Sequence, residues 1–548
     1  MQVVVAQGHG GGVVVAGAGE LSEAQFARYV ADLERSRAPR WVMSSVARLY
    51  PVLLRFGVRI GRCLDLSLTE GLLLAAAGKA GEPKELPAAW ARLHGLEPPP
   101  DSPAHADQQP ALFDAREPGL PPGTDPARAA EDVLAAQERR ITRLDHPDRF
   151  RLLIAAESAS ALVAAEMGVD GLPWRADVHD RLLTELLGPR TPAGQRPKKL
   201  AELATRISDA FGGKPVNPDS PQTIVRAFGR EGISVPSARA HVLRTVDHPA
   251  VPLLIEYREL ARLHSANGWA WLDEWVDGGR FRPSWVVGGV VSGRWASSGG
   301  GALQIPKTLR VCVRADPGWK LVVADAAQLE PRVLAALSGD RRLAEASAST
   351  DLYARLADAM FAGTMDVTEG RPRAKIAMLS AMYGGTAGEA ASLLALLRRR
   401  FPDAVSYVEH AARAGERGER VRSRLGRVSP APSAAWRALT GGSDDDVRAR
   451  QAARDWGRFT RNFVVQASAA DFTSVLLATL RRRLPAPAHL VFFQHDEVIV
   501  HAPEQLAPDV ETAIAASVPE AARLTFGPAC PVHFPMQPVT VDTYADAK

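Results

Sequence analysis

The sequence predicts a multidomain α+β protein, and three observations lead to this fold class. The chain has 548 residues, 46% of them apolar and 23% charged, which is typical of a globular protein with several packed cores. Short β-branched runs alternate with long stretches of helical periodicity. A segment crowded with proline, residues 97–126, interrupts both patterns and predicts an exposed loop. We therefore expect three or four domains.

The charge balance and the cysteine content narrow the class of protein. With 66 basic and 62 acidic residues the net charge is only +4, so a polyanionic partner would need a local basic patch. Cys63, Cys312 and Cys530 lie far apart and outside any CxxC pattern, which predicts neither a disulfide framework nor a zinc site. The sequence has no run of 18 apolar residues and no signal-peptide pattern, so we expect a cytoplasmic protein without a membrane partner.

The first half of the chain predicts an α/β domain followed by a helical region. β-branched runs at residues 3–5 and 13–15 precede helical periodicity at 24–33 and 47–55. Beyond the proline-rich loop, long helical patterns are separated by further prolines, which end helices. These patterns cover residues 128–144, 150–167 and 178–187.

The second half predicts short strands between long helices. Strand candidates at 286–291 and 321–324 follow a tryptophan-rich segment, and helical patterns extend from residue 332 to about residue 471. Two apolar runs, 490–493 and 498–501, then flank four polar residues. This arrangement predicts a β-hairpin with carboxylates at its tip.

Three carboxylates stand where predicted strands end. Asp325 follows the strand 321–324, and Asp496 and Glu497 occupy the hairpin tip. If these strands are neighbours in one sheet, the acids converge and their mutual repulsion favours a bound cation. Carboxylate oxygens suit Mg²⁺, and two such ions about 4 Å apart support phosphoryl transfer. The simpler interpretations are a helix N-cap for Asp325 and an ordinary polar turn at the hairpin.

A stripe of side chains at intervals of four forms a second feature. Arg371, Lys375, Leu379 and Tyr383 lie on one face of a predicted helix, with the basic pair near its N-terminus. Because the helix dipole adds positive potential there, this end is suited to a triphosphate. The alternative is a solvated basic face in an arginine-rich chain, in which only nine of the 66 basic residues are lysine.

In this order and spacing, the segments resemble motifs A, B and C of the family A (DNA polymerase I-like) DNA polymerases. Residues 325–332 resemble the family's DYSQIELR, residues 371–384 its RxxxKxxxFxxxYG helix, and residues 495–497 its HDE. Residues 292–298 and 303–306 resemble its TGRLSS and LQNIP segments. The likeness covers over half the chain and implies a right-hand polymerase fold with palm, fingers and thumb.

The resemblance implies a role for each matching residue. Asp325 and Asp496 would bind two Mg²⁺ ions, for which Mn²⁺ could substitute, with Glu497 beside them. Arg371 and Lys375 would bind the triphosphate. Lys375 would also protonate the departing pyrophosphate, which arginine could not do. Glu330 would lie under the incoming sugar and obstruct a 2′-hydroxyl. Further residues implied to bind the nucleotide are Arg371, Leu379, Tyr383, Gln328 and Tyr353, and those implied to hold primer and template are Arg294, Gln304, Arg332, Arg458, Asn462, Gln466 and His495.

Several positions depart from the family pattern. Leu379 stands where the family has an aromatic residue, and Ala326 and Ala327 replace the Tyr-Ser of motif A. Tyr353 replaces a histidine that contacts the triphosphate, and Gln494 lies one residue later than the family's glutamine. Because both metal aspartates and the Arg/Lys pair remain, these departures predict altered kinetics or fidelity.

The resemblance also implies the order of the domains. We expect a ribonuclease H-like 3′→5′ exonuclease-type domain at residues 1–145 and a helical thumb at 146–250. Palm segments would occupy 251–340 and 456–548, with fingers at 341–455 between them. Nothing upstream is long enough for a separate 5′ nuclease.

The exonuclease-type domain lacks the acids that proofreading needs. Members of the family use DxE, NxxxD and YxxxD segments, but residues 3–15 contain no Asp or Glu, residues 45–49 lack the aspartate and residues 128–132 lack the tyrosine. Asp65 and Asp132 alone could not assemble a two-metal hydrolytic site. We therefore expect a vestigial domain without proofreading.

These expectations combine into a monomeric DNA polymerase of the bacterial cytoplasm or nucleoid. It would extend a primer on template DNA with deoxynucleoside triphosphates, in replication or repair. Three alternatives remain open. They are a single-subunit RNA polymerase, against which Glu330 argues; a non-catalytic DNA-binding repair scaffold, against which Asp325, Lys375 and Asp496 argue; and a bifunctional polymerase with residual exonuclease activity.

Overall fold

Two compact units make up the chain. The computed structural model describes residues 1–8, 12–102, 119–192, 194–301, 305–361, 365–385, 388–442 and 446–547. We call the two units the large unit, which comprises Met1–Val169, Trp285–Ala296 and Gly318–Val541, and the small unit, which comprises Asp170–Ser284, Ser297–Pro317 and Asp542–Lys548.

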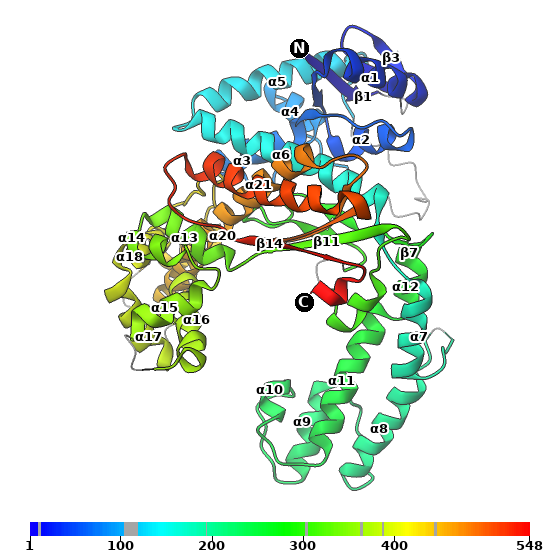
Figure 1. Ribbon diagram of the computed structural model, residues 1–548. Coiled ribbons are helices and arrows are strands. Elements are labelled where there is room, and N and C mark those ends of the chain that lie inside the picture. The colour runs from blue at the N-terminus through cyan, green and yellow to red at the C-terminus, as the bar shows by residue number, and fades with distance from the viewer. Residues whose placement is uncertain are drawn as a thin grey trace. The chain divides into compact units, whose positions relative to one another are not determined.

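The N-terminal part of the large unit is an α/β structure, as the sequence predicts. Its five-stranded sheet has the order β3-β2-β1-β4-β5 (Figure 1). The central strand β1 is antiparallel to β2 and parallel to β4, and β4 is parallel to β5. The strands are β1 (Gln2–Gln7), β2 (Val13–Val15), β3 (Gly19–Leu21), β4 (Arg40–Met43) and β5 (Arg62–Asp65).

Side chains of β1 alternate between two cores, one on each face of this N-terminal sheet. Val3 and Val5 pack with residues of α1 and α2, whereas Val4 and Ala6 pack with residues of α4 and α5. This alternation follows from the two-residue period of a strand. The helices of this part are α1 (Glu23–Arg37), α2 (Val46–Arg55), α3 (Leu66–Ala76), α4 (Leu86–Leu93) and α5 (Pro126–Thr142).

The C-terminal part of the large unit is built on a four-stranded antiparallel sheet with the order β12-β13-β11-β14. The sequence predicts its central strand and its hairpin, and both predictions are confirmed. The four strands are β11 (Trp319–Ala326), β12 (His489–Gln494), β13 (Glu497–Pro503) and β14 (Met536–Val541). β11 is apolar and buried along residues 321–324, which fixes its end beside the hairpin tip.

Helices of the large unit share one extended core with this sheet. The 37-residue helix α20 packs on α18 and α21, and α21 packs in turn on β11 and β14. In Figure 1 helices α13–α18 gather at one side of this part. The helices are α13 (Leu329–Ser338), α14 (Arg341–Ala346), α15 (Leu352–Phe361), α16 (Val367–Tyr383), α17 (Glu389–Arg400), α18 (Pro402–Glu416), α19 (Ala434–Thr440), α20 (Val447–Arg483) and α21 (Ala507–Phe526).

Helix α6 (Pro147–Asp170) joins the two parts of the large unit. Its residues Phe150 and Leu153 lie in the core of the C-terminal sheet, and Leu162 lies in the core of the N-terminal sheet. The predicted boundary at residue 145 therefore differs from the observed division, because α6 is apolar on more than one side and belongs with the large unit. The small unit begins at Asp170 instead of at residue 146.

Within the part of the chain that the structure describes, two helices are long and apolar enough, by length and composition alone, to cross a membrane. They are α6 and α20, and 67% and 89% of their most apolar windows are buried inside the protein. Such burial is that of core helices, whose apolar surface is covered by protein.

The small unit is largely helical, with one three-stranded sheet. Two of the prolines that break the helical patterns lie at helix starts, Pro197 before α8 and Pro221 in the first turn of α9. Trp174, Trp271 and Phe281 pack against one another in this unit. Its elements are α7 (Ala176–Leu187), α8 (Lys198–Ala210), α9 (Pro221–Arg230), α10 (Ala240–Leu243), α11 (Ala250–Asn267), α12 (Trp269–Trp275), β6 (Leu172–Pro173), β7 (Val276–Asp277) and β8 (Arg280–Phe281).

The predicted strand at 286–291 is wrong over most of its length. The observed strand β9 (Ser284–Val286) ends where a turn begins, and it pairs with β10 (Ala296–Ser298). Gly288 and Gly293 adopt positive φ angles in the connection. These angles favour a turn over a continuing strand.

Candidate active site

The carboxylates that the sequence places at strand ends come together in the C-terminal sheet. Asp325, near the end of β11, lies directly opposite Glu497 of β13. Asp496 occupies the two-residue turn before β13, and its carbonyl accepts a hydrogen bond from the Ala326 N–H at 2.9 Å. Residues directly opposite in an antiparallel pair project from the same face. The condition for the acids to converge, that these strands are neighbours in one sheet, is met.

The donor set at this edge fits magnesium with a small number of protein ligands. Asp325 and Asp496 are half-buried, whereas Glu497 is buried. Over the described residues, no group of three or more His, Cys, Asp and Glu side chains is arranged to hold a metal ion. Mg²⁺ commonly takes one or two carboxylates and completes its shell with water and substrate phosphate oxygens. Two aspartates at one edge suit that mode of binding.

A pocket of about 220 Å³ opens beside Asp496. It brings together segments that lie far apart in the sequence, namely the turn before β10, the start of α13, the start of α15, α20 and the hairpin tip. Its polar lining residues are Arg294, Gln328, Glu330, Tyr353, His495 and Asp496. Six of the predicted site residues therefore share one cavity.

Glu330 is the centre of a hydrogen-bonded group at this pocket. Arg294 donates to one of its carboxylate oxygens, and the Tyr383 hydroxyl donates to the other at 2.6 Å. Tyr383 is the last residue of α16, which ends at Gly384 in the left-handed conformation. Burial and the contact with Glu330 raise the pKa of Tyr383 to about 12, so the hydroxyl is a neutral donor at physiological pH.

The predicted stripe on α16 is present but divides into two environments. Lys375 is exposed, whereas Leu379 is partly buried against the core of the C-terminal sheet. Arg371 donates from Nε to Asp351 Oδ2 at 2.6 Å and lies 5.9 Å from the centre of the Tyr353 ring. The basic end of the stripe is therefore accessible to an anion, whereas Leu379 is partly buried against the core.

Gln328 is held by the start of α15. Its Oε1 accepts a hydrogen bond from the Leu352 N–H at 2.8 Å, and its Nε2 donates to Asp351 Oδ1 at 3.3 Å. The residue has a φ of 51°, in the left-handed region that few non-glycine residues adopt. These two contacts hold the bend that carries the chain from Asp325 into α13.

Arg332 does not lie at a surface, which corrects its predicted role as a DNA contact. Its side chain is fully buried and donates to five backbone carbonyls. Burial lowers the pKa of its guanidinium to about 10, which still leaves it charged at neutral pH. The guanidinium ties α13 to two other segments; the accepting residues are Ala327, Ser347, Ser349, Thr350 and His533.

Replacing Arg332 with methionine is expected to lower the free energy of unfolding by about 3 kcal/mol or more, because buried carbonyls lose their donors. Urea unfolding measures the change. Arg341→Met on the neighbouring α14 is the control, since that side chain is 92% exposed and its replacement should cost less than about 0.5 kcal/mol. If the Arg332→Met variant were as stable as the wild type but bound DNA more weakly, the result would support the prediction that Arg332 contacts DNA.

Residues implied to hold DNA follow one side of α20. Arg458, Asn462 and Gln466 recur at intervals of four, so they share a helix face. Arg458 is exposed and pairs with Asp455. A Cβ atom on Gly384 would lie 2.7 Å from the Arg458 side chain, so the end of α16 passes close to this face.

Of two further residues implied to hold DNA, the structure describes His495 but not Gln304. His495 lines the pocket beside Asp496, and burial followed by the positive charge of Arg294 lowers its pKa, which favours the neutral ring. The prediction for Gln304 falls outside the described residues.

A buried charged group beneath the turn that carries Arg294 is not predicted from the sequence. Arg427 donates to Glu157 of α6 and, at 3.3 Å, to Asp471 of α20. A Cβ atom on Gly293 would lie 2.4 Å from the Arg427 guanidinium, so only glycine fits over it. The missed signal is the presence of two acids, Glu157 and Asp471, inside otherwise apolar helical patterns, because a buried carboxylate needs a paired cation.

Asp65 and Asp132, the two acids of the N-terminal part that the sequence analysis considers for a nuclease site, are each held by other partners. Asp65 is buried, and its carboxylate accepts hydrogen bonds from the Val46 N–H at 2.7 Å and the Leu68 N–H at 2.8 Å. Burial raises its pKa to about 6. Asp132 pairs with Arg128 on the same helix at 3.7 Å. Asp65 is thus the N-cap of α3.

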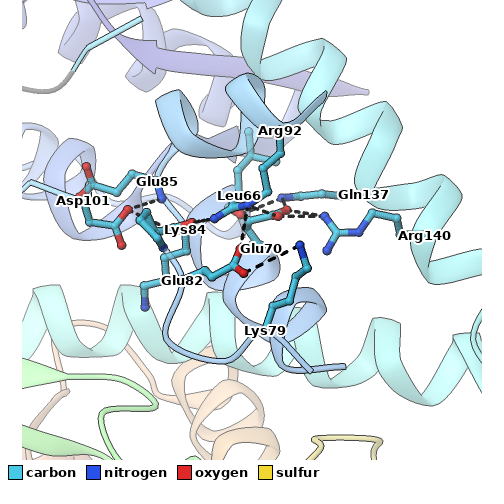
Figure 2. Close-up of polar contacts among 11 residues, drawn as sticks. Leu66, Glu70, Lys79, Glu82, Lys84, Glu85, Arg92, Asp101, Gln137 and Arg140 are labelled. Atoms are coloured by element: carbon cyan, nitrogen blue, oxygen red, sulfur yellow. Dashed lines mark hydrogen bonds and ion pairs between the residues drawn. The ribbon is translucent and has the colours of Figure 1, made fainter. Parts of the chain in front are cut away.

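Helix α5 is fastened over the N-terminal sheet by a buried carboxylate. Figure 2 shows Glu70 of α3 accepting hydrogen bonds from Gln137 and Arg140 of α5. The distances to Glu70 Oε2 are 3.1 and 2.8 Å. Since α5 also packs on Val4 and Ala6 of the central strand β1, this face of the N-terminal sheet is covered by apolar side chains.

Comparison with known proteins gives concordant matches. The family model described as DNA polymerase family A matches residues 193–537. The chain is 28% identical over 293 residues to a thermostable DNA polymerase I of Thermus filiformis, covering 49% of this chain and 33% of the relative. It is 28% identical over 353 residues to DNA polymerase I of Chloroflexus aurantiacus (56% and 35%) and 26% identical over 445 residues to that of Bacillus subtilis (73% and 48%). The chain thus spans about a third of the first two relatives.

Among solved structures, the fold is similar to that of the POL domain of Pol1 from M. smegmatis in complex with DNA primer-template and dNTP. The TM-score is 0.74, with 19% sequence identity, and the match covers 100% of this chain and 95% of that one.

Proposed function

Because the chain belongs to DNA polymerase family A, we propose that it is a template-directed DNA polymerase that adds deoxynucleotides to a primer 3′ end. The observation that carries the proposal is the meeting of Asp325 and Asp496 at one edge of the C-terminal sheet, beside a pocket lined by Glu330. In this proposal that sheet is the palm, helices α14–α19 form the fingers and the small unit is the thumb.

The chemistry rests on positioning and on charge. Asp325 and Asp496 would hold two Mg²⁺ ions, with Glu497 beside them. When bound, such a pair activates the primer 3′-hydroxyl and stabilises the leaving oxygen. Mn²⁺ could substitute for Mg²⁺, because it favours the same oxygen ligands.

The exposed basic end of α16 would meet the triphosphate. Lys375 presents a mobile ammonium group that can donate a proton to the departing pyrophosphate. Glu330, held by Arg294 and Tyr383, would occupy the space that a 2′-hydroxyl needs. Leu379, which is partly buried, stands where the family has an aromatic ring, so stacking on the incoming base would be weaker.

Primer and template would lie along the face of α20 that carries Arg458, Asn462 and Gln466, with Arg294 and His495 at the primer end. Contacts of this kind hold the DNA without reading its sequence. We assign the protein to DNA replication or repair in the bacterial cytoplasm, acting as a monomer.

We further propose that the enzyme does not proofread. Strand β1 carries no Asp or Glu that could supply a DxE pair, and its Val4 and Ala6 are buried against α5. Asp65 already accepts two backbone hydrogen bonds as a helix cap. A primer with a mismatched 3′ end should therefore keep its length when it is incubated with Mg²⁺ and without nucleotides.

Primer extension on a recessed template tests the proposed function. The purified protein should lengthen the primer with Mg²⁺ and the four deoxynucleoside triphosphates, and chelation with EDTA should stop it. The lane without nucleotides tests the absence of proofreading, and shortening there would favour a bifunctional enzyme. A folded protein that binds primer-template with no extension would favour the alternative, a non-catalytic repair scaffold.

A further inference from the structure

Asp351 faces the residue that we propose to bind the triphosphate. We propose that Asp351 is a positioning residue that competes with the triphosphate for Arg371 and thereby sets the affinity of the enzyme for nucleotides. This inference rests on the proposed function. It adds an acidic residue, contributed by the start of α15, to the end of α16 whose basic side chains, Arg371 and Lys375, would meet the triphosphate.

The contact between Arg371 and Asp351 is short and directional. Arg371 Nε lies 2.6 Å from Asp351 Oδ2, and the guanidinium also lies over the Tyr353 ring. The two side chains are 43% and 39% exposed, so the pair lies at a surface that an incoming anion can reach. A charge-assisted bond of this length neutralises much of the positive charge that Arg371 would offer.

The other carboxylate oxygen of Asp351 has a separate task. Oδ1 accepts from the Ala354 N–H at 3.2 Å and from Gln328 Nε2 at 3.3 Å, so it caps α15 and holds the bend after Asp325. The two oxygens are therefore divided between two functions. Arg371 can leave Oδ2 while the contacts of Oδ1 keep Asp351 in place.

The charges then decide the consequence for nucleotide binding. A triphosphate that contacts Arg371 must replace Oδ2, and the released carboxylate stays beside it because α15 holds it there. The released carboxylate and the triphosphate are both negatively charged, so they repel each other and the carboxylate weakens triphosphate binding. A ligand shifts an equilibrium between two states only by the difference in its affinity for them. The triphosphate therefore has to bind the Arg371 guanidinium more strongly than Asp351 does.

The substitution Asp351→Asn separates charge from structure. The amide oxygen still accepts the capping hydrogen bond, but the negative charge is gone. Asp366→Asn is the matched control, because Asp366 caps the neighbouring helix α16 through the N–H groups of Thr368 and Glu369 and pairs with no arginine in the described part of the chain. Both variants remove one acid from a helix N-terminus.

Two measurements on the complex with primer-template test the inference. One is KM and kcat for a single correct deoxynucleotide. The other is the Kd of that nucleotide on a complex whose primer ends in a dideoxynucleotide, which reports binding without chemistry. In Asp351→Asn, KM and Kd should each fall about two- to five-fold, with a smaller change in kcat, as expected for a half-exposed ion pair. Asp366→Asn should leave Kd within about two-fold.

An unchanged or higher Kd in Asp351→Asn would overturn the inference, because it would show that the carboxylate only shapes the site. The inference would also fail if Asp366→Asn lowered Kd equally, since the effect would then be general charge. Failure of the proposed function has a different signature. The wild-type protein would then not extend the primer at all, while a lower Kd in Asp351→Asn would still support the competition.

Discussion

Alanine at Asp325 or at Asp496 is expected to reduce primer extension by about 10³-fold or more, while DNA binding persists. Each substitution removes a carboxylate from the edge of the C-terminal sheet where these residues meet. If that edge holds the metal ions, transition-state stabilisation worth several kcal/mol is lost, and each 1.36 kcal/mol corresponds to a factor of ten in rate. Single-turnover extension on a recessed template measures the loss directly.

A matched control separates a lost ligand from a lost fold. Asp148→Ala removes an acid from the first turn of α6, where the side chain is 95% exposed, and should extend primers like the wild type. Thermal unfolding and fluorescence anisotropy with labelled primer-template should give the same Tm and Kd, within error, for all variants. If Asp325→Ala kept more than a tenth of the wild-type rate, the metal site would have to lie elsewhere.

The convergence of these acids could be predicted because it depends on local pattern. An apolar run that ends in Asp325, and two apolar runs around four polar residues, each specify a strand and its end. What joins them is the resemblance, which implied that Asp325 and Asp496 bind the same pair of metal ions. Composition alone does not specify which strands are neighbours, because the pairing joins residues about 170 positions apart.

The sequence does not show which partner a charged side chain meets in the folded chain. Arg332 looks like a surface cation in the sequence, yet its guanidinium is bound by carbonyls from three segments. Asp351 looks like an ordinary helix cap, and only the tertiary structure brings it to Arg371. In both cases the deciding contact is tertiary, and no period or spacing within one element encodes it.

The domain boundary shows a similar limit. Helix α6 looks like one more helix of a helical region, because periodicity does not reveal what a helix packs against. Its apolar residues face two cores at once, so the compact unit ends at Val169. A helix that is apolar on several sides is a buried helix, and this feature of residues 150–167 could have moved the boundary.

Alanine at Glu330 is expected to raise the incorporation of ribonucleotides relative to deoxynucleotides by about 10²-fold. In the structure the Glu330 carboxylate is fixed by Arg294 and by Tyr383, and it lines the pocket beside Asp496. A fixed side chain of this size cannot move aside for an added hydroxyl. Its removal opens that volume, so discrimination of a few kcal/mol is lost. The ratio of kcat/KM for one ribonucleotide and its deoxynucleotide measures the change.

Glu330→Gln keeps the volume and removes the charge, so it distinguishes steric from electrostatic exclusion. The glutamine side chain should retain most of the sugar discrimination, because its amide fills the same space and its oxygen can accept from Tyr383 or Arg294. Loss of deoxynucleotide incorporation in both variants would indicate instead that Glu330 serves to hold Arg294 and Tyr383. Unchanged ribonucleotide incorporation in Glu330→Ala would assign the choice of sugar to another residue of the pocket, and Glu330 would then no longer argue against a single-subunit RNA polymerase.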